Sequence, residues 1–239
     1  MKLIKESEMR SIIISICENV GLSKNDSAVV SDALVEANLR GVDTHGIRTL
    51  PVYIKRFEHG SLNKKPVVEI DRETNIAASV NGDNGLGHII GEKSMLIAIE
   101  KAKKFGIGLV TARNSNHFGA TAYFSMKALK NNYIGIAMTN ATARLAPTGG
   151  ITPCYGNNPW SMAIPTGDIP IVSDMAMSVV ANSNIIIARE KGTQIPYGWA
   201  LTKDGEPTQD PNLAELLLPF GAYKGYAIAI INEILSGVL

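Results

Sequence analysis

The alternation of strand-type and helix-type segments after Pro66 is the feature that most constrains the fold of this 239-residue chain. Short apolar runs typical of strands and longer patterns of helical period follow one another through the middle of the sequence. The strand-type runs are residues 67–70, 77–80, 107–110 and 134–138, and the helical patterns are residues 88–105 and 119–129. Strands that alternate with helices predict an α/β protein with a partly parallel or mixed sheet.

The first 65 residues are helical in pattern throughout. The spacing of their apolar residues predicts three helices, which end at Gly21, Gly41 and Gly60. Either Ser23 or Asp26 can cap the second helix, and Pro51 suits the first turn of the third. We therefore predict an N-terminal helical segment over residues 1–65 and an α/β domain over residues 66–239.

The C-terminal part of the chain contains two further patterns. Residues 149–170 are rich in glycine, proline and asparagine, which predicts irregular structure. A mostly apolar helix is expected over residues 221–239, and it reaches Leu239 without a cap or a polar tail. Because such a helix needs to be buried, we expect the α/β domain to be truncated at its C-terminus and to belong to a longer polypeptide.

Composition excludes several classes of function. Lys and Arg total 23 against 22 acidic residues, and a general nucleic-acid binder needs a basic surplus. No stretch reaches the roughly 18–20 apolar residues of a membrane span, and the N-terminus lacks the pattern of a signal peptide. Cys17 and Cys154 match no metal-ligand spacing. They indicate reduced thiols of a cytoplasmic protein, and no metal site is predicted.

Two histidines lie in glycine-containing segments that suit catalysis. His45 is flanked by Thr44 and, three residues on, Arg48; an imidazole between a hydroxyl and a cation suits acid–base chemistry on a carboxylate substrate. His117 follows the predicted strand 107–110 and opens a helix, where α/β proteins place ligands. The alternatives are an incidental histidine in a helix C-cap loop for His45, and a capping or core histidine for His117.

Two further segments suit binding of a nucleotide. Asp174 is expected to end a strand, where its carboxylate can hold a ribose hydroxyl or can instead cap a following helix. Lys224 lies between glycines at the start of a predicted helix, which is a favourable position for phosphate or carboxylate. The alternative for Lys224 is a solvated lysine in a loop.

A glycine-rich segment, Gly85-Leu86-Gly87-His88-Ile89-Ile90-Gly91, is close to the Rossmann dinucleotide-binding motif but does not match it. Its last glycine is four residues after the second instead of three. No P-loop is present either. If the chain binds a dinucleotide, we expect it to use a different fold.

Six segments together resemble the malate/L-lactate dehydrogenase family of the second type, which also includes ureidoglycolate and sulfolactate dehydrogenases. Each segment is only modestly specific, but all six occur in order and cover essentially the whole chain. They are Gly41-Val42-Asp43-Thr44-His45-Gly46, Asn114-Ser115-Asn116-His117-Phe118-Gly119, Pro147-Thr148-Gly149-Gly150, Gly156-Asn157-Asn158-Pro159, Asp174-Met175-Ala176 and Lys224-Gly225-Tyr226.

The resemblance implies a non-Rossmann α/β fold, a homodimer, and NAD or NADP as the hydride carrier. It implies an oxidoreductase that moves a hydride between NAD(P) and C2 of a small 2-hydroxy or 2-keto acid of the malate or lactate type. His117 becomes the proton acceptor, with His45 as the second catalytic histidine. Thr44 and Arg48 border the substrate within the N-terminal helical segment. The implied cofactor contacts are Asp174, Met175, Ala176 and Lys224.

The chain departs from the family pattern at several positions. Thr49 lies where the family usually has arginine, Ala141 where a serine is common, and Ser183-Asn184 where a Gly-Lys pair is usual. Two other hypotheses stay open. One is an imine reductase acting on a cyclic 2-carboxylate, because similar proteins catalyse this reaction on the same scaffold. The other, which the Ser183-Asn184 departure and the expected C-terminal truncation motivate, is a non-catalytic relative that binds a small acid or only dimerises.

Overall fold

The computed structural model describes residues 4–238, which fold as an α/β protein. Contacts divide the chain into two compact units. The first comprises Met1–Gly135 and Ala163–Ile171, and the second comprises Ile136–Met162 and Val172–Leu239. The predicted domain boundary between residues 65 and 66 stays a prediction.

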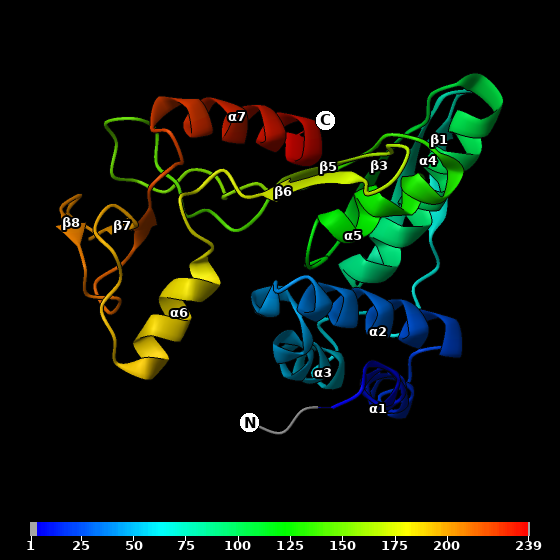
Figure 1. The fold of residues 1–239 in the computed structure, drawn as a ribbon, viewed down its shortest axis with the longest axis horizontal. Coiled ribbons are helices and arrows are strands. Elements are labelled where there is room, and N and C mark those ends of the chain that lie inside the picture. The colour runs from blue at the N-terminus through cyan, green and yellow to red at the C-terminus, as the bar shows by residue number, and fades with distance from the viewer. Residues whose placement is uncertain (1–3, 239) are drawn as a thin grey trace. The chain divides into compact units, whose positions relative to one another are not determined.

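Three helices open the first unit, as the sequence predicts (Figure 1). They are α1 (Glu6–Asn19), α2 (Lys24–Leu39) and α3 (Leu50–Glu58), with the 3-10 turns η1 (Asp43–His45) and η2 (Ile47–Thr49) between the last two. The cap of α2 is Ser23, whose hydroxyl accepts a hydrogen bond of 3.1 Å from the backbone N–H of Asp26. Asp26 therefore lies inside the first turn of the helix.

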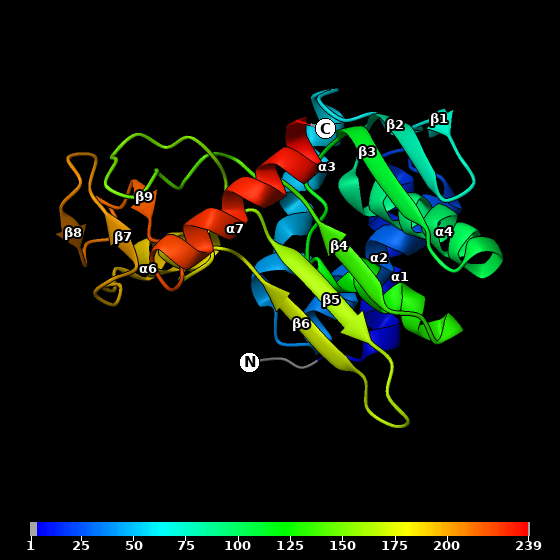
Figure 2. The ribbon, with the colours of Figure 1, turned by 90° about the horizontal axis from the view of Figure 1, so that it is seen from above.

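A mixed sheet follows the three helices, which confirms the predicted fold class. Its strands are β1 (Glu69–Glu73), β2 (Ala77–Gly85) and β3 (Leu109–Ser115), in the order β1-β2-β3. β1 and β2 are antiparallel, whereas β2 and β3 are parallel and are connected by the long helix α4 (Gly87–Phe105). Figure 2 shows α4 along one face of this sheet, where the alternate β2 residues Ala78 and Val80 are buried.

Two boundaries in this region differ from the prediction. β3 continues to Ser115 instead of ending at residue 110, because its register against β2 extends past the apolar run into polar residues. The helix predicted over 119–129 is a short α5 (Ala122–Ser125) followed by the 3-10 helix η3 (Met126–Asn131). Gly119 has a positive φ of 78°, so the backbone there cannot start a right-handed helix.

A second three-stranded sheet has the order β4-β5-β6, with β4 (Gly135–Met138), β5 (Trp160–Ile164) and β6 (Ile171–Met175). Irregular structure was the prediction for residues 149–170, and it is wrong for β5. Ser161 and Ala163 are fully buried and alternate with partly buried neighbours, which is the pattern of a strand packed on one face. The many turn residues on either side obscure this short alternation in the sequence.

The rest of the second unit contains two helices and a small sheet. The helices are α6 (Asn182–Lys191) and α7 (Tyr223–Glu233), and a π-helical turn, η4 (Ile234–Val238), follows α7. The small sheet has the order β8-β7-β9, from β7 (Ala200–Leu201), β8 (Pro207–Thr208) and β9 (Leu216–Leu217). The start of α7 agrees with the predicted apolar helix, which gives way to the π-helical turn after Glu233.

Each unit has its own apolar core. In the first, side chains of α1, α2, α3 and the start of α4 pack together, including Ile13, Leu34, Tyr53, Phe57, Ile89 and Ile90. In the second, the core comes from the segments around α6 and α7, including Leu145, Met177, Ile185, Ile195 and Ala229. Among the described residues, 4–238, no helix is long and apolar enough to cross a membrane.

The glycines of the near-Rossmann segment serve packing between α4 and the chain after β3. A Cβ on Gly87 would lie 2.1 Å from the carbonyl oxygen of Asn116, and one on Gly91 would lie 2.6 Å from the ring of Phe124. Real Cβ atoms do not approach this closely. These two glycines therefore let the segment that carries His117 approach α4.

We expect Gly87→Ala to lower the free energy of unfolding by about 1–3 kcal/mol, because the new methyl group overlaps the backbone of Asn116. Gly167→Ala is the matched control, since its Cβ meets nothing within 4 Å, and it should change stability by less than about 0.5 kcal/mol. Urea unfolding of both variants measures the difference. Equal stability of the two would contradict this account of the packing.

Candidate active site

One face of α3 carries three polar side chains toward the loop that contains His117. Thr49, Tyr53 and Arg56 are spaced i, i+4 and i+7, which places them on one helical stripe. The Tyr53 hydroxyl lies 2.6 Å from Nδ1 of His117, and Nη2 of Arg56 donates to Oδ1 of Asn116 at 2.7 Å. Tyr53 is only 3% exposed. Burial of Tyr53 in the core of the first unit therefore fixes the hydroxyl that contacts the His117 ring.

His45 lies against the same ring. The imidazoles of His45 and His117 are stacked, with centroids 5.7 Å apart and an angle of 11° between their planes. Nδ1 of His45 is 3.0 Å from the Thr44 hydroxyl. Asn38 of α2 fixes this turn, because its side chain donates to Asp43 and accepts from the backbone N–H of Ile47. The structure thus brings together Thr44, His45 and His117, as the sequence predicts.

The hydrogen bond between Tyr53 and His117 depends on the tautomer of the ring. When Nδ1 carries the proton of neutral His117, Nδ1–H donates to the Tyr53 oxygen and Nε2 can accept a proton. When Nε2 carries the proton, the Tyr53 hydroxyl donates to Nδ1 instead. A base that acts through Nε2 therefore needs the tautomer protonated at Nδ1.

Electrostatics around His117 favour the neutral ring. Desolvation by burial, and then the positive charges of His45 and Arg56, lower the pKa of His117 to about 4. Because the His117 side chain still has an exposed surface, solvent screens part of this effect. Burial raises the pKa of Tyr53 to about 12, against the opposing influence of Thr49 and Arg56. At neutral pH, the Tyr53 hydroxyl is therefore protonated and the His117 imidazole is neutral, with a proton on only one of its two nitrogens.

A third histidine packs beneath Tyr53. His88 is 1% exposed, and its ring meets the Tyr53 ring edge-on with centroids 5.3 Å apart. Neither ring nitrogen has a hydrogen-bond partner within residues 4–238. Burial first, and then the charges of His117 and His45, lower the pKa of His88 to about 3. His88 is therefore neutral and acts as packing that supports Tyr53.

The predicted substrate cation, Arg48, has a different environment from the histidines. Its side chain is exposed on η2, while the next residue, Thr49, faces Tyr53. The family's usual arginine position therefore holds a hydroxyl, which donates to the carbonyl oxygen of Gly46 at 2.8 Å. A role of Arg48 in substrate binding stays a prediction.

The predicted cofactor residues lie in the second unit. Asp174 and Met175 are exposed at the end of β6, Ala176 follows them, and Lys224 is exposed in the first turn of α7. These two segments are neighbours, because the backbone N–H of Phe220 donates to the carbonyl of Met177 at 3.0 Å and Ser178 forms a β-bridge with Pro219. Their contact with a cofactor stays a prediction.

The Gly-Asn-Asn-Pro turn organises the region of the Ala141 departure. Asn158 is fully buried, and its side chain accepts from the backbone N–H of Ala141 and donates to Ala229 and Glu233 of α7. The backbone at position 141 is therefore held by Asn158. The other departure, Ser183-Asn184, lies in the first turn of α6, so the lysine usual there is missing from a helix N-terminus.

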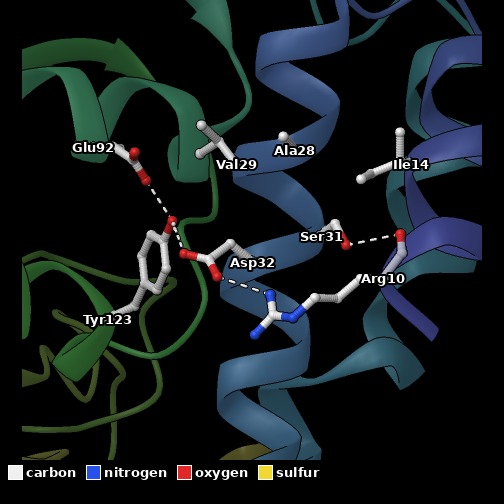
Figure 3. A pocket seen from close by; sticks show the side chains of 8 residues that line it. All are labelled: Arg10, Ile14, Ala28, Val29, Ser31, Asp32, Glu92 and Tyr123. Carbon is white, nitrogen blue, oxygen red and sulfur yellow. Dashed lines mark hydrogen bonds and ion pairs between the residues drawn. The ribbon is translucent and has the colours of Figure 1, made fainter. Parts of the chain in front are cut away.

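A separate pocket of about 350 Å³ in the first unit contains none of the predicted site residues (Figure 3). Asp32 of α2 accepts from Arg10 of α1 at 2.7 Å, from Tyr123 of α5 at 3.1 Å and from Lys127 at 3.2 Å. The Tyr123 hydroxyl also contacts the Glu92 carboxylate. Burial raises the pKa of Asp32, but Lys127, Tyr123 and Arg10 outweigh it and the pKa is lowered. This network joins helices of the first unit.

Sequence reasoning missed three side chains of the site: Tyr53, Arg56 and His88. Tyr53 and Arg56 look like ordinary residues of an amphipathic helix, and only their spacing from Thr49 signals a shared polar face. His88 lies inside the near-Rossmann segment, in which the glycines are the recognisable feature and the histidine is not part of the motif. Contacts between α3 and a loop more than 60 residues away cannot be read from local pattern.

Comparison with known proteins identifies the class to which this fold and site belong. The model of the malate/L-lactate dehydrogenase family matches residues 4–239. The malate/(S)-sulfolactate dehydrogenase of Methanothermus fervidus is 41% identical over 99% of this chain and 70% of its own length. The NAD(+) ureidoglycolate dehydrogenase of Escherichia coli K12 is 33% identical over 100% of this chain and 68% of its own.

A solved structure agrees with these relatives. The sulfolactate dehydrogenase of Methanocaldococcus jannaschii superposes with a TM-score of 0.92 at 38% identity, over 99% of this chain and 70% of that one. The protein is an α/β dehydrogenase by fold. The chain belongs to the malate/L-lactate dehydrogenase family.

We expect Tyr53→Phe to change the tautomer of His117, because Nδ1 loses the hydroxyl that it contacts at 2.6 Å. The ¹⁵N chemical shifts of His117 above its pKa should show Nδ1 protonated in the natural protein and a substantial Nε2–H population in the variant. Tyr197→Phe, which removes the hydroxyl of an exposed tyrosine, is the matched control. An unchanged tautomer in Tyr53→Phe would refute a hydrogen bond from Nδ1–H of His117 to Tyr53.

Proposed function

We propose that this chain is an NAD(P)-dependent dehydrogenase that oxidises a small 2-hydroxy acid at C2, or reduces the corresponding 2-keto acid. The observation that carries the proposal is the environment of His117. Its Nδ1 contacts buried Tyr53, and burial, followed by the charges of His45 and Arg56, lowers its pKa. In the proposed tautomer, Nδ1–H donates to Tyr53 and Nε2 accepts the substrate proton. Family membership supports the same activity.

The reaction divides between the cofactor and the histidine. The bound nicotinamide supplies a hydride acceptor for the hydrogen on C2. Nε2 of His117 takes the hydroxyl proton as the C2–O bond becomes a carbonyl, and it returns the proton in the reduction. Tyr53 and Thr49 keep the ring oriented during this exchange. His45, stacked on His117, borders the substrate and adds positive potential beside the base.

The residues of the second unit fit a dinucleotide. The N-terminus of α7, with exposed Lys224, offers backbone N–H groups and an ammonium to a phosphate. Exposed Asp174 and Met175 at the end of neighbouring β6 suit a ribose hydroxyl and an apolar ring face. NAD or NADP is the proposed cofactor, and the name of the E. coli relative favours NAD(+).

The remaining parts of the proposal follow the family. Thr44 and Arg48 are proposed to border a substrate of the malate or lactate type, and the protein is proposed to act as a homodimer. Both cysteines are free: Cys17 is buried and Cys154 is exposed. Free thiols support a reducing compartment, the cytoplasm.

A cofactor titration followed by a substrate panel tests this proposal. NADH and NADPH fluorescence first measures binding, and turnover is then measured with malate-type and lactate-type 2-keto acids and with a cyclic imine 2-carboxylate. Turnover of a 2-keto acid supports the proposal. Turnover of the imine alone would make the protein an imine reductase. Binding without turnover of any compound would make it a non-catalytic relative.

His117→Ala should lower kcat by roughly 10²–10⁴-fold with little change in cofactor affinity, which is the usual effect of losing a positioned general base. Because the His117 pKa lies near 4, its ring is already neutral at higher pH. The kcat/KM for oxidation should therefore be flat above about pH 5 and fall in more acidic solution as the ring becomes protonated. Nearly natural turnover in the variant would remove His117 from the mechanism.

Lys224→Ala should weaken cofactor binding measured by calorimetry, because it removes the ammonium at the start of α7. Lys191→Ala is the matched control. Lys191 is also an exposed lysine, but it lies at the C-terminal end of a helix, α6, whereas Lys224 lies at the N-terminal end of α7. Equal cofactor affinity in the two variants would show that Lys224 is an ordinary solvated lysine.

A further inference from the structure

Arg56 is a cation near His117 that has no carboxylate partner among the described residues. Its side chain is partly buried, and its guanidinium donates to the neutral side-chain amide of Asn116. Among residues 4–238, no carboxylate lies within ion-pair distance of it, whereas Arg10 and Arg113 each pair with an aspartate. A partly desolvated charge without a counter-charge costs free energy. This cost indicates that Arg56 serves to bind an anion.

We propose that Arg56 binds the C1 carboxylate of the substrate. This inference rests on the proposed dehydrogenase function. In a 2-hydroxy acid, C1 is bonded directly to C2, whose oxygen exchanges a proton with His117. The cation that binds the carboxylate must therefore lie beside the base, and Arg56 is joined to Asn116, the residue that precedes His117.

The stripe of polar residues on α3 explains why this role falls to Arg56. Thr49, at the position where the family usually has arginine, carries a neutral hydroxyl that donates to the carbonyl oxygen of Gly46. Arg48, one residue earlier, is exposed. Arg56, two helical turns beyond Thr49, is the guanidinium of the same stripe. A guanidinium can use two parallel N–H groups on a carboxylate, even while Nη2 contacts Asn116.

The Asn116 side chain holds the guanidinium in this place. Its Oδ1 accepts from Arg56, while its Nδ2 donates to Oδ1 of Asn84 and to the carbonyl of Gly85. The amide is thus held from both ends, which fixes Oδ1 toward α3. The cation is preorganised before any substrate arrives, so less side-chain entropy is lost on binding.

Binding of a carboxylate here also improves the base. In the free protein, burial lowers the pKa of His117 most, and the charges of His45 and Arg56 lower it further. A carboxylate on Arg56 neutralises one of these charges, so the His117 ring becomes more basic when the substrate is bound. The same contact would therefore position the substrate and strengthen the proton acceptor.

Oxamate and its neutral diamide, oxamide, test the proposal directly. Both have the shape of a 2-keto acid, but only oxamate carries a carboxylate. With the protein saturated with NADH, we expect Arg56→Gln to weaken oxamate binding about 10- to 100-fold, the usual effect of losing a charged hydrogen-bond partner. Oxamide binding should stay within about twofold. Lys55→Gln, which removes an exposed charge from the neighbouring position, should leave both ligands unaffected.

Two further variants separate binding from structure. Arg56→Lys keeps the charge and should weaken oxamate binding less than Arg56→Gln does. If Arg56 is purely structural, the two variants should lower the melting temperature equally, and neither should weaken oxamate binding more than oxamide binding. Arg48→Gln tests the other cation. If Arg48→Gln weakens oxamate binding and Arg56→Gln does not, Arg48 is the carboxylate ligand and the proposal is overturned.

A readout that does not need turnover completes the test. In NMR titrations, oxamate should raise the pKa of His117 in the natural protein but not in Arg56→Gln, where the free-state pKa should already be higher. Failure of the natural protein to bind oxamate or any 2-keto acid would overturn the proposed function and this inference together. Binding that is insensitive to Arg56→Gln would overturn this inference alone.

Discussion

The hydrogen bond between Tyr53 and Nδ1 of His117 joins two positions that are 64 residues apart in the chain. Its geometry depends on the core of the first unit, because Tyr53 is buried among the helices and rests on the edge of His88. The loop that carries His117 reaches α3 only because Gly87 has no side chain to obstruct Asn116. Packing of apolar residues therefore determines the orientation of the His117 ring.

Arg56 brings a positive charge to the surroundings of this contact. Burial lowers the pKa of His117 most, and the charges of His45 and Arg56 lower it further. Among residues 4–238, no carboxylate lies within ion-pair distance of Arg56, whereas Asp32 in the same unit pairs with Arg10 and Lys127. The surroundings of His117 therefore disfavour a second proton on its ring and favour an anionic ligand on Arg56.

Much of the fold follows from local pattern. Periodicities that differ clearly between helix and strand mark the helices α1 to α3, the long α4 that ends before Gly106, and the runs that form β2 and β4. The sequence does not predict β5, because its five alternating residues lie among turn residues. The predicted end of β3 is too early, because hydrogen bonding to β2 continues through polar residues. Sheet register depends on the partner strand, which a single segment does not reveal.

By itself, the sequence determined the fold class and the family, because glycine-containing motifs in a fixed order specify backbone geometry. It also singled out His45 and His117 as candidates, and the structure places their rings against each other. Only the tertiary structure decided which groups surround His117. Tyr53, Arg56 and His88 come from two helices distant in sequence, and their effects on the tautomer and pKa of His117 depend on distances of a few ångströms. Hydrogen bonds and charges act through space, so the packing of α3 and α4 had to be known before these roles could be assigned.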